Sequence, residues 1–286
     1  MMQTAGRRRR VVITGSNGGI GRAMTRAFGA TMDLVLTDMA GPALANFERD
    51  LRDGGYVVSA TIPGDLSDAK VLAEVIAAGA SGAGLGVFVH TAALSPTGAT
   101  WDRIITVNLV ATERLLQALD PILTPGSVVI VISSNAGYFA PVDQELSDLI
   151  TDPLHPQLLS RLQPHVERLS ASTDEMDRSS TAYMFSKWGV TELCARRAPD
   201  WTRRGARLVT ISPGTVDTPM GRAERERNPR AAMFIDCIPA GRMATAMDIV
   251  ATAQFLASDG ASFISGCDIR IDGAAVPAIQ AMLAHK

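Results

Sequence analysis

Short apolar runs alternate with amphipathic stretches along most of the chain. Runs rich in β-branched residues and leucine predict buried strands at 11–14, 34–37, 56–62, 86–90, 128–133, 207–211 and 267–271. Between them, apolar residues at helical spacing predict helices at 20–30, 42–52, 69–78, 100–119, 181–197 and 246–256. Strands that alternate with helices indicate right-handed crossovers and a parallel sheet. We therefore expect residues 1–286 to form a single doubly wound α/β domain of the Rossmann type.

The segment 141–180 interrupts this alternation. It is polar and contains Pro153, Pro156 and Pro164, while leucine and valine residues between 158 and 169 recur near one face of a helix. We expect an inserted pair of short helices here, immediately before the helix at 181–197. Two interpretations of the insertion are equally good. It is either a solvated excursion, or a functional segment that serves as a lid or as a wall against a partner subunit.

Composition narrows the class of protein. The 286 residues carry 27 Lys and Arg against 29 Asp and Glu, and a net charge of −2 argues against a general nucleic-acid partner. No apolar run approaches the roughly 20 residues needed to span a bilayer, so no membrane segment is expected. Three cysteines without Cys-x-x-Cys spacing suggest reduced thiols and a cytoplasmic protein: Cys194, Cys237 and Cys267.

Two features of the sequence, the arginine run and the histidines, do not indicate a function. Arg7–Arg10 is followed by only three apolar residues before a glycine-rich turn, too few for an export signal. We therefore expect a solvated lead-in to the first strand. No metal site is expected, because the four histidines have no paired spacing typical of metal ligands: His90, His155, His165 and His285.

A glycine-rich turn joins the first expected strand to the first expected helix. Residues 15–21 read Gly-Ser-Asn-Gly-Gly-Ile-Gly. Glycines permit positive φ and let a backbone approach a pyrophosphate, while the N-terminus of the helix offers free N–H groups. The turn alone is weak evidence, but the strand before it and an acidic residue further on indicate a dinucleotide site.

That acidic residue is Asp38, at the end of the second strand and 17 residues after Gly21. A carboxylate there can accept hydrogen bonds from both ribose hydroxyls and repels a 2′-phosphate. We therefore predict NAD(H) rather than NADP(H), with Arg22 as the one nearby basic residue that argues otherwise. Asp65 follows the third strand and is expected either to reach the adenine or to cap the next helix.

Tyr183 and Lys187 form the candidate catalytic pair. They stand at i and i+4 in a predicted helix, so their side chains share one face. A phenol with an ordinary pKa near 10 is a poor base, and a nearby ammonium favours the phenolate. Such a tyrosine can take a proton from an alcohol. Because Tyr-x-x-x-Lys is common by chance, its weight comes from its place among the strands and glycines.

In combination these motifs resemble the short-chain dehydrogenase/reductase family, from Val11 to about Pro277. The residues that carry the resemblance lie at the ends of successive strands: Thr14–Gly21, Asp38, Asp65-Leu66, Asn108, Ser133-Ser134, Tyr183–Lys187, Pro213-Gly214 and Asp272-Gly273.

The resemblance implies a role for each catalytic residue. Tyr183 would be the general acid/base, and Lys187 would lower its pKa and hold the nicotinamide ribose. Ser134, three positions before Gly137, would hydrogen-bond the substrate oxygen, and Asn108 would hold a water in the proton relay to Lys187. The same resemblance implies residues that line NAD: Gly15, Ser16, Gly19, Ile20, Gly21, Asp38, Asp65, Leu66, Ala92, Tyr183, Lys187, Pro213, Val216 and Thr218.

Two departures from the family pattern stand out. Many members carry Asn-Asn-Ala-Gly after the fourth strand, whereas this chain has His90-Thr91-Ala92-Ala93. We interpret His90 as a hydrogen-bonded residue under the cofactor rather than a base. Ser134 and Tyr183 are also 49 residues apart, farther than in most members, which resembles a subgroup with a long helical insertion that contains bacterial 3α-hydroxysteroid dehydrogenase/carbonyl reductase. There the insertion covers one dimer contact, which favours a dimer over a tetramer.

The predicted function is that of an NAD-dependent oxidoreductase that interconverts a secondary alcohol and a ketone. The substrate would be a small molecule such as a hydroxysteroid or another bulky apolar carbonyl, walled by the insertion and by residues 220–238. An epimerase or dehydratase is disfavoured, because nothing after Gly273 is long enough for a second domain. A non-catalytic NAD(H)-sensing binding protein on the same scaffold is the alternative from another class.

Overall fold

The computed structural model describes residues 8–284, and Arg7 of the arginine run and His285 lie outside them. The strands are β1 (Arg10–Thr14), β2 (Asp33–Asp38), β3 (Val58–Pro63), β4 (Leu85–His90), β5 (Val128–Ile132), β6 (Arg207–Pro213) and β7 (Asp268–Ile271). The longer helices are α1 (Gly19–Gly29), α2 (Gly41–Asp53), α3 (Ala69–Ala80), α5 (Ala111–Leu119), α6 (Gln144–Ile150), α7 (Leu158–Leu169), α8 (Glu175–Arg203), α9 (Pro219–Arg227), α10 (Pro229–Asp236), α11 (Ala246–Ala257) and α12 (Ala275–Ala284). Shorter turns are η1 (Pro96–Gly98), α4 (Trp101–Ile104), η2 (Ile105–Val110), η3 (Asp120–Ile122), η4 (Asn135–Phe139) and η5 (Asp259–Ala261).

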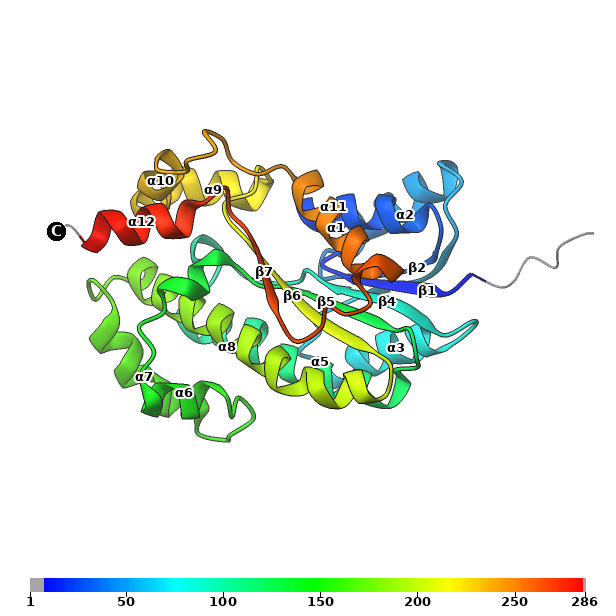
Figure 1. Ribbon diagram of the computed structural model, residues 1–286, viewed down its shortest axis with the longest axis horizontal. Coiled ribbons are helices and arrows are strands. Elements are labelled where there is room, and N and C mark those ends of the chain that lie inside the picture. Colours follow the sequence, from blue (N-terminus) through cyan, green and yellow to red (C-terminus); the bar gives the residue numbers. More distant parts are fainter. Residues whose placement is uncertain (1–7, 285–286) are drawn as a thin grey trace, which may run out of the picture.

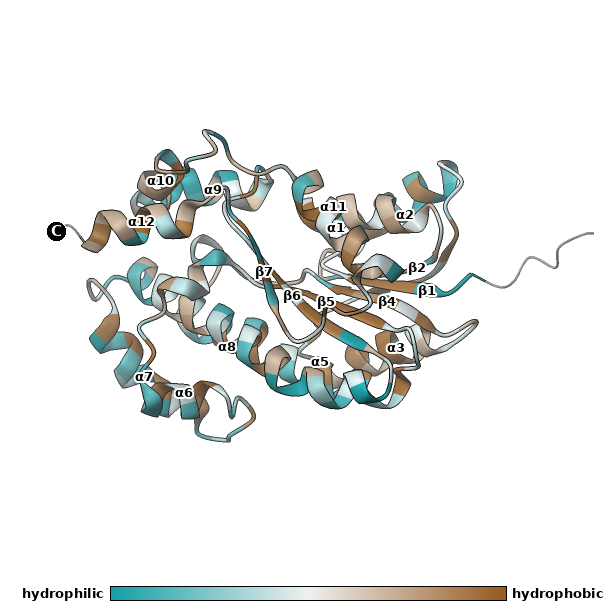
Figure 2. Ribbon diagram, viewed as in Figure 1, coloured by the Kyte–Doolittle hydropathy of each residue, from teal (hydrophilic) through white to brown (hydrophobic). Residues whose placement is uncertain are grey.

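All seven strands are parallel, in the order β3-β2-β1-β4-β5-β6-β7, with helices on both faces (Figure 1). Successive side chains of a strand face opposite sides of the sheet. In β1, Val11 and Ile13 join one buried core with α1, α2 and α11, while Val12 joins the other core with α3, α5 and α8. Because both faces are covered, the inner strands are apolar along most of their length (Figure 2). The expected doubly wound fold is confirmed.

The strand order reverses at β1, because the chain moves first outward to β2 and β3 and then returns to β4 on the other side. Such a switch point opens a crevice at the carboxyl ends of the strands. The loops after β1, β4, β5 and β6 therefore bring Gly15, Ala92, Ser134 and Gly214 to one edge of the sheet.

The expected helix at 100–119 is not regular. It consists of α4, a π-helical turn (η2) and α5, and Asn108 lies within the widened turn. Helix α8 is longer than expected because it begins at Glu175 rather than near 181. Its first turn is held by the Glu175 side chain, which accepts hydrogen bonds from the Trp101 backbone N–H and the Ser179 hydroxyl.

Helices α9, α10 and α12 were not expected from the sequence. Residues 219–227 are strongly polar and show no apolar periodicity. Local capping starts α9 and α10 instead: proline occupies the first turn of each, and the Thr218 and Asn228 side chains accept hydrogen bonds from Gly221 N–H and Ala231 N–H.

The segment 141–180 contains α6 and α7, which pack against each other and against α8 (Figure 1). Leu146, Ile150 and Leu162 are buried in the same core cluster as Phe185 and Val190 of α8. These helices therefore extend the core on the side of α8. Across residues 8–284, no helix combines the length and apolar character that a membrane crossing requires.

Candidate active site

Gly15 and Gly21 of the glycine-rich turn lie where a side chain would not fit. Gly15 has φ of +62°, and a Cβ there would lie 2.8 Å from the Ala92 backbone nitrogen. A Cβ on Gly21 would lie 2.0 Å from the Gly15 carbonyl oxygen, so the first turn of α1 sits directly on the loop. Ser16 is fully buried, and its hydroxyl donates to the Thr37 carbonyl. The Ser16 hydroxyl therefore supports the loop from inside.

The N-terminus of α1 fits a dinucleotide phosphate. Its N-cap is Gly18, which offers no side chain to the first amides of the helix. Uncapped amides at the positive end of a helix dipole form a ready anion site. Ile20 is partly exposed at this terminus. The residues present thus fit the pyrophosphate of a nicotinamide dinucleotide.

Asp38 lies beside this turn. Its carboxylate accepts hydrogen bonds from the Asn17 N–H at 3.0 Å and the Ala40 N–H at 3.2 Å. The Asn17 side chain in turn accepts from Arg22, whose guanidinium stacks 4.3 Å from the centre of the Phe47 ring. Arg22, the basic residue that argued against NAD(H) in the sequence, thus contacts Asn17 and Phe47.

Asp65 occupies the other end of the crevice after β3. Although burial opposes it, hydrogen bonds from Ser67 and Arg103 lower the pKa of Asp65. Its carboxylate accepts from the Ser67 N–H at 2.9 Å and pairs with Arg103 at 3.1 Å. The helix that follows is capped by Asp68 instead, and Leu66 lies partly buried between the two acids.

The two serines that follow β5 have different partners. The Ser133 hydroxyl is buried and donates to the Lys187 backbone carbonyl at 2.9 Å. The Ser134 hydroxyl instead forms a hydrogen bond with the Tyr183 side chain. Gly137 explains the close approach, because a Cβ there would lie 2.9 Å from the Trp188 backbone nitrogen. The structure therefore brings Ser134, rather than Ser133, to the phenol.

Tyr183 and Lys187 share one face of α8, as their spacing predicts. The Lys187 ammonium lies 5.5 Å from the centre of the Tyr183 ring and donates to the Ile132 carbonyl at 3.2 Å. Burial lowers the pKa of Lys187 to about 8. An ammonium has three donors, and this bond uses one, so the remaining N–H groups suit a sugar hydroxyl.

The pKa of Tyr183 is not lowered in the protein alone. Burial raises the pKa of Tyr183 to about 12, the hydrogen bond with Ser134 opposes the rise, and the Glu224 charge adds to it. Burial of the phenol therefore outweighs the groups that favour the phenolate. Any activation of Tyr183 must therefore come with the bound cofactor or substrate.

Asn108 acts on the loop after β4. Its side chain accepts from the Leu94 N–H at 2.8 Å and donates to the Leu94 carbonyl at 3.0 Å. A longer contact of 3.4 Å reaches the Ser186 hydroxyl, next to Lys187 in sequence. The Asn108 side chain therefore has its hydrogen-bond partners within the protein. The backbone of the widened turn is the part of this residue that could bind another group.

The loop after β6 lies against the N-terminus of α1. Pro213 ends the strand, and Val216 is buried and bridges to Ala244. A Cβ on Gly19 would lie 2.4 Å from Thr218 Cγ2. The structure thus brings the N-terminus of α1 into contact with a residue almost 200 positions later in the chain.

Glu224 of α9 is a residue that the sequence analysis missed. Its carboxylate accepts hydrogen bonds from the Thr97 N–H at 3.0 Å and hydroxyl at 2.6 Å. Its charge is close enough to raise the pKa of Tyr183. In the sequence it stands among arginines and another glutamate, a pattern typical of a solvated face. The sequence pointed to Glu224 only through its position in the segment 220–238, which was expected to line the substrate.

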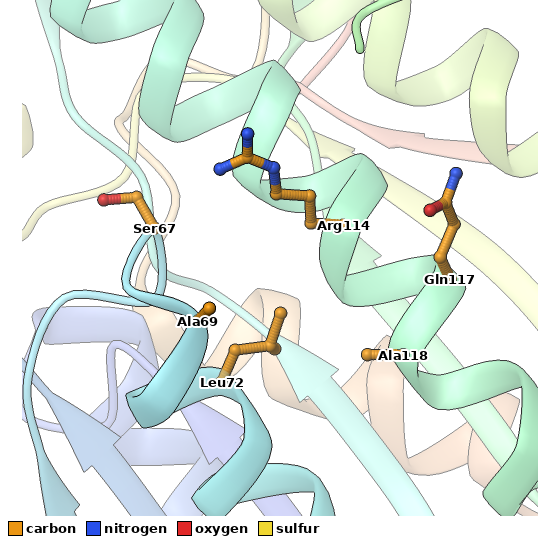
Figure 3. Close-up of a pocket in the computed structure, with 6 residues that line it drawn as sticks. All are labelled: Ser67, Ala69, Leu72, Arg114, Gln117 and Ala118. Carbon is orange, nitrogen blue, oxygen red and sulfur yellow. The ribbon is translucent and has the colours of Figure 1, made fainter.

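A separate hollow of about 390 Å³ lies between α3 and α5 (Figure 3). It is lined by Ser67, Ala69, Leu72, Arg114, Gln117 and Ala118. None of the predicted site residues lines it, so it is distinct from the crevice that holds Tyr183. Among the described residues, no group of three or more His, Cys, Asp or Glu side chains is placed to hold a metal ion.

Comparison with known proteins identifies the family. A family model for short chain dehydrogenases matches residues 9–145, and one for enoyl-(acyl carrier protein) reductase matches residues 168–274. A short-chain dehydrogenase/reductase of Alternaria brassicicola is 30% identical over 275 residues, covering 93% of this chain and 95% of its own. The chain belongs to the short-chain dehydrogenase/reductase family. The seven-stranded parallel fold and the nicotinamide-binding crevice are those of this family of oxidoreductases.

Other relatives of this short-chain dehydrogenase/reductase act on different substrates. Galactitol 2-dehydrogenase of Cereibacter sphaeroides is 27% identical, covering 91% of this chain and 92% of its own. The 3-alpha-hydroxysteroid dehydrogenase/carbonyl reductase of Comamonas testosteroni is 29% identical, covering 92% and 95%. A glucose/ribitol dehydrogenase structure from Brucella melitensis shares the fold, with a TM-score of 0.71 at 23% identity and coverage of 94% and 97%.

Proposed function

We propose that this short-chain dehydrogenase/reductase interconverts a secondary alcohol and a ketone with NAD(H). The observation that carries the proposal is the hydrogen bond between the Ser134 and Tyr183 side chains, with Lys187 on the same face of α8. Two hydroxyls that meet at the carboxyl edge of the sheet can bind one substrate oxygen together. A non-catalytic sensor would have no need of this pairing.

Each residue has a distinct part in the proposed reaction. A bound nicotinamide cofactor would supply the hydride chemistry at the carbinol carbon. In alcohol oxidation Tyr183 takes the hydroxyl proton as the C–H bond is broken, and in reduction it returns that proton to the carbonyl oxygen. Ser134 donates a hydrogen bond to the same oxygen and stabilises the charge that develops there. Lys187 would bind the ribose, and Asn108 would support the proton relay to Lys187.

NAD(H) is preferred in this proposal because of Asp38. Its carboxylate stands at the end of β2 beside the glycine-rich turn, where it would accept from ribose hydroxyls and repel a 2′-phosphate. Arg22, the nearest basic side chain, is engaged by Asn17 and Phe47. The dinucleotide would be held by Gly15, Ser16, Gly19, Ile20, Gly21, Asp38, Asp65, Leu66, Ala92, Tyr183, Lys187, Pro213, Val216 and Thr218.

Two substrate classes follow from different observations. The insertion at 141–180 and the hydroxysteroid relative support a hydroxysteroid or another bulky apolar carbonyl. Glu224 supports a polyhydroxy substrate instead, because a carboxylate beside Tyr183 can accept from a second hydroxyl. The galactitol-oxidising relative points the same way. We also propose a homo-oligomer, with α6 and α7 covering part of the surface of α8.

The decisive experiment replaces the phenol. Tyr183→Phe is expected to abolish NADH-linked turnover of every accepted substrate while NADH affinity, followed by fluorescence titration, changes little. Retained turnover would remove Tyr183 from the reaction. A panel of steroids, cyclic ketones and polyols then separates the two substrate classes, and NADH binding without turnover of any of them would favour the sensor.

A further inference from the structure

His90, the last residue of β4, lies outside the catalytic group but at the centre of a buried hydrogen-bonded chain. Its ring Nδ1 is 2.7 Å from the Thr14 hydroxyl at the end of β1, and its Nε2 is 3.0 Å from the Thr112 hydroxyl of α5. All three residues are at most 5% exposed. One side chain thus bridges the end of β1 and helix α5.

The hydrogen-bond pattern decides which ring nitrogen carries the proton. Thr112 Oγ1 donates to the Asn108 backbone carbonyl at 2.7 Å. A hydroxyl has only one proton to donate, so Thr112 must accept its bond from His90. The proton of the ring is therefore on Nε2.

The other ring nitrogen follows from neutrality. Burial, and then the Lys187 charge, lower the pKa of His90 to about 3, so the imidazole is neutral and has a single N–H. Nδ1 is then an acceptor, and the Thr14 hydroxyl donates to it. The Thr14 oxygen in turn accepts from the Thr91 N–H at 3.2 Å and the Ala92 N–H at 3.3 Å. Every donor in the chain has an acceptor.

This chain joins the two halves of the site. At one end, Thr14 directly precedes Gly15, which packs against Ala92. At the other end lies the backbone carbonyl of Asn108, in the widened turn η2. The side chain of Asn108 reaches the Ser186 hydroxyl. The Lys187 charge acts on the same imidazole. The glycine-rich turn and the relay residues are therefore connected through His90.

We propose that His90 is a positioning residue: as the Nε2–H tautomer it holds the Asn108 carbonyl and the Thr14–Gly15 strand end in fixed register. It does so through Thr112, which is a second positioning residue. The role assigned to Asn108 rests on the proposed function, but the tautomer and the bridge do not. Asparagine, frequent at this position in the family, ends one atom short of Nε2 and would not reach Thr112.

The first test reads the tautomer without activity. Long-range ¹H–¹⁵N correlation of ¹⁵N-labelled protein should show one histidine with a protonated Nε2 and an unprotonated Nδ1. Its shifts should stay constant between about pH 5.5 and 8.5, and the signals should vanish in His90→Asn. A protonated Nδ1, or a His90 that titrates in this range, would overturn the proposal.

The second test measures the consequence for the relay. Thr112→Val removes the bridging hydroxyl and should lower kcat about tenfold, as the loss of a positioned hydrogen bond does. The Kd for NADH should stay within about twofold, and Thr112→Ser should restore kcat. An unchanged kcat in folded Thr112→Val, or no rescue by serine, would overturn the role.

A double variant gives an independent readout. His90→Asn and Thr112→Val each break the same link, so their effects on kcat should not add in the double variant. Additive losses would show separate structural defects and overturn the bridge. Turnover that survives Tyr183→Phe would refute the proposed function instead, and the tautomer measured by NMR would be unaffected by that result.

Discussion

Glu224 of α9 and Thr97 of η1 are joined by two hydrogen bonds, from the Thr97 N–H at 3.0 Å and its hydroxyl at 2.6 Å. A third bond of 3.3 Å comes from Asn228, the N-cap of α10. The segment after β6 is thus connected to the loop after β4 beside Tyr183. This contact also fixes a negative charge near the phenol.

The Glu224 charge has a consequence for pH dependence. Glu224→Gln removes the charge but keeps an oxygen that can accept from Thr97. The pKa of Tyr183 should fall, because this charge helps to raise it, so alcohol oxidation should reach its plateau at lower pH. Activity below the midpoint should rise about two- to threefold. Glu226→Gln, an exposed change on the same helix, should leave the profile unchanged.

The adjacent serines should respond differently to alanine. Ser134→Ala removes a hydroxyl that contacts Tyr183 and should lower kcat by about 100-fold with little change in melting temperature. Ser133→Ala removes the bond to the Lys187 carbonyl and should cost about 1 kcal/mol of stability. Steady-state kinetics and thermal unfolding of both variants distinguish the two effects. Equal losses of kcat would contradict the assignment.

Asp38 should control the choice of cofactor. Asp38→Ala removes the carboxylate that repels a 2′-phosphate, so the ratio of kcat/KM with NADP to that with NAD should rise by about tenfold or more. Asp50→Asn, an exposed change on α2, should leave the ratio unaltered. A wild-type preference for NADP would contradict the prediction directly.

Lys187 should make stability depend on pH. Its pKa is about 8 in the folded protein, against 10.5 for an ordinary lysine side chain in water. Between these values the unfolded chain binds more protons, so this group makes the free energy of unfolding rise with pH; below about 8 both states are charged and the burial cost is complete. From about pH 7.5 to 10, wild type should gain roughly 1–3 kcal/mol relative to Lys187→Met.

Urea unfolding at several pH values tests this difference. Tyr183 is present in both proteins, so its own titration cancels. Lys70→Met changes an exposed lysine and should show no pH-dependent difference from wild type. A gain of the same size in that variant would assign the effect to general charge rather than to burial of Lys187.

Much of the fold followed from local pattern. Val11, Val12 and Ile13 are apolar because both faces of a parallel strand are covered, and this run predicts a buried strand without further knowledge. The glycines at 15–21 predict a tight turn into a helix because only glycine tolerates that packing. The one-turn spacing of Tyr183 and Lys187 places them on one face, whatever lies around them.

Tertiary structure decided the rest, because those properties depend on neighbours that are distant in the chain. The family pattern favours Ser134 over Ser133 by its distance from Gly137, but the partner of each hydroxyl depends on packing, because the Lys187 carbonyl binds Ser133. Helices α9 and α10 start from capping bonds and not from an apolar stripe. The pKa of Tyr183, the approach of Glu224 and the tautomer of His90 arise from burial and contacts between separate elements. The sequence thus determined which groups are present and in what order, whereas packing determined their partners and their charge.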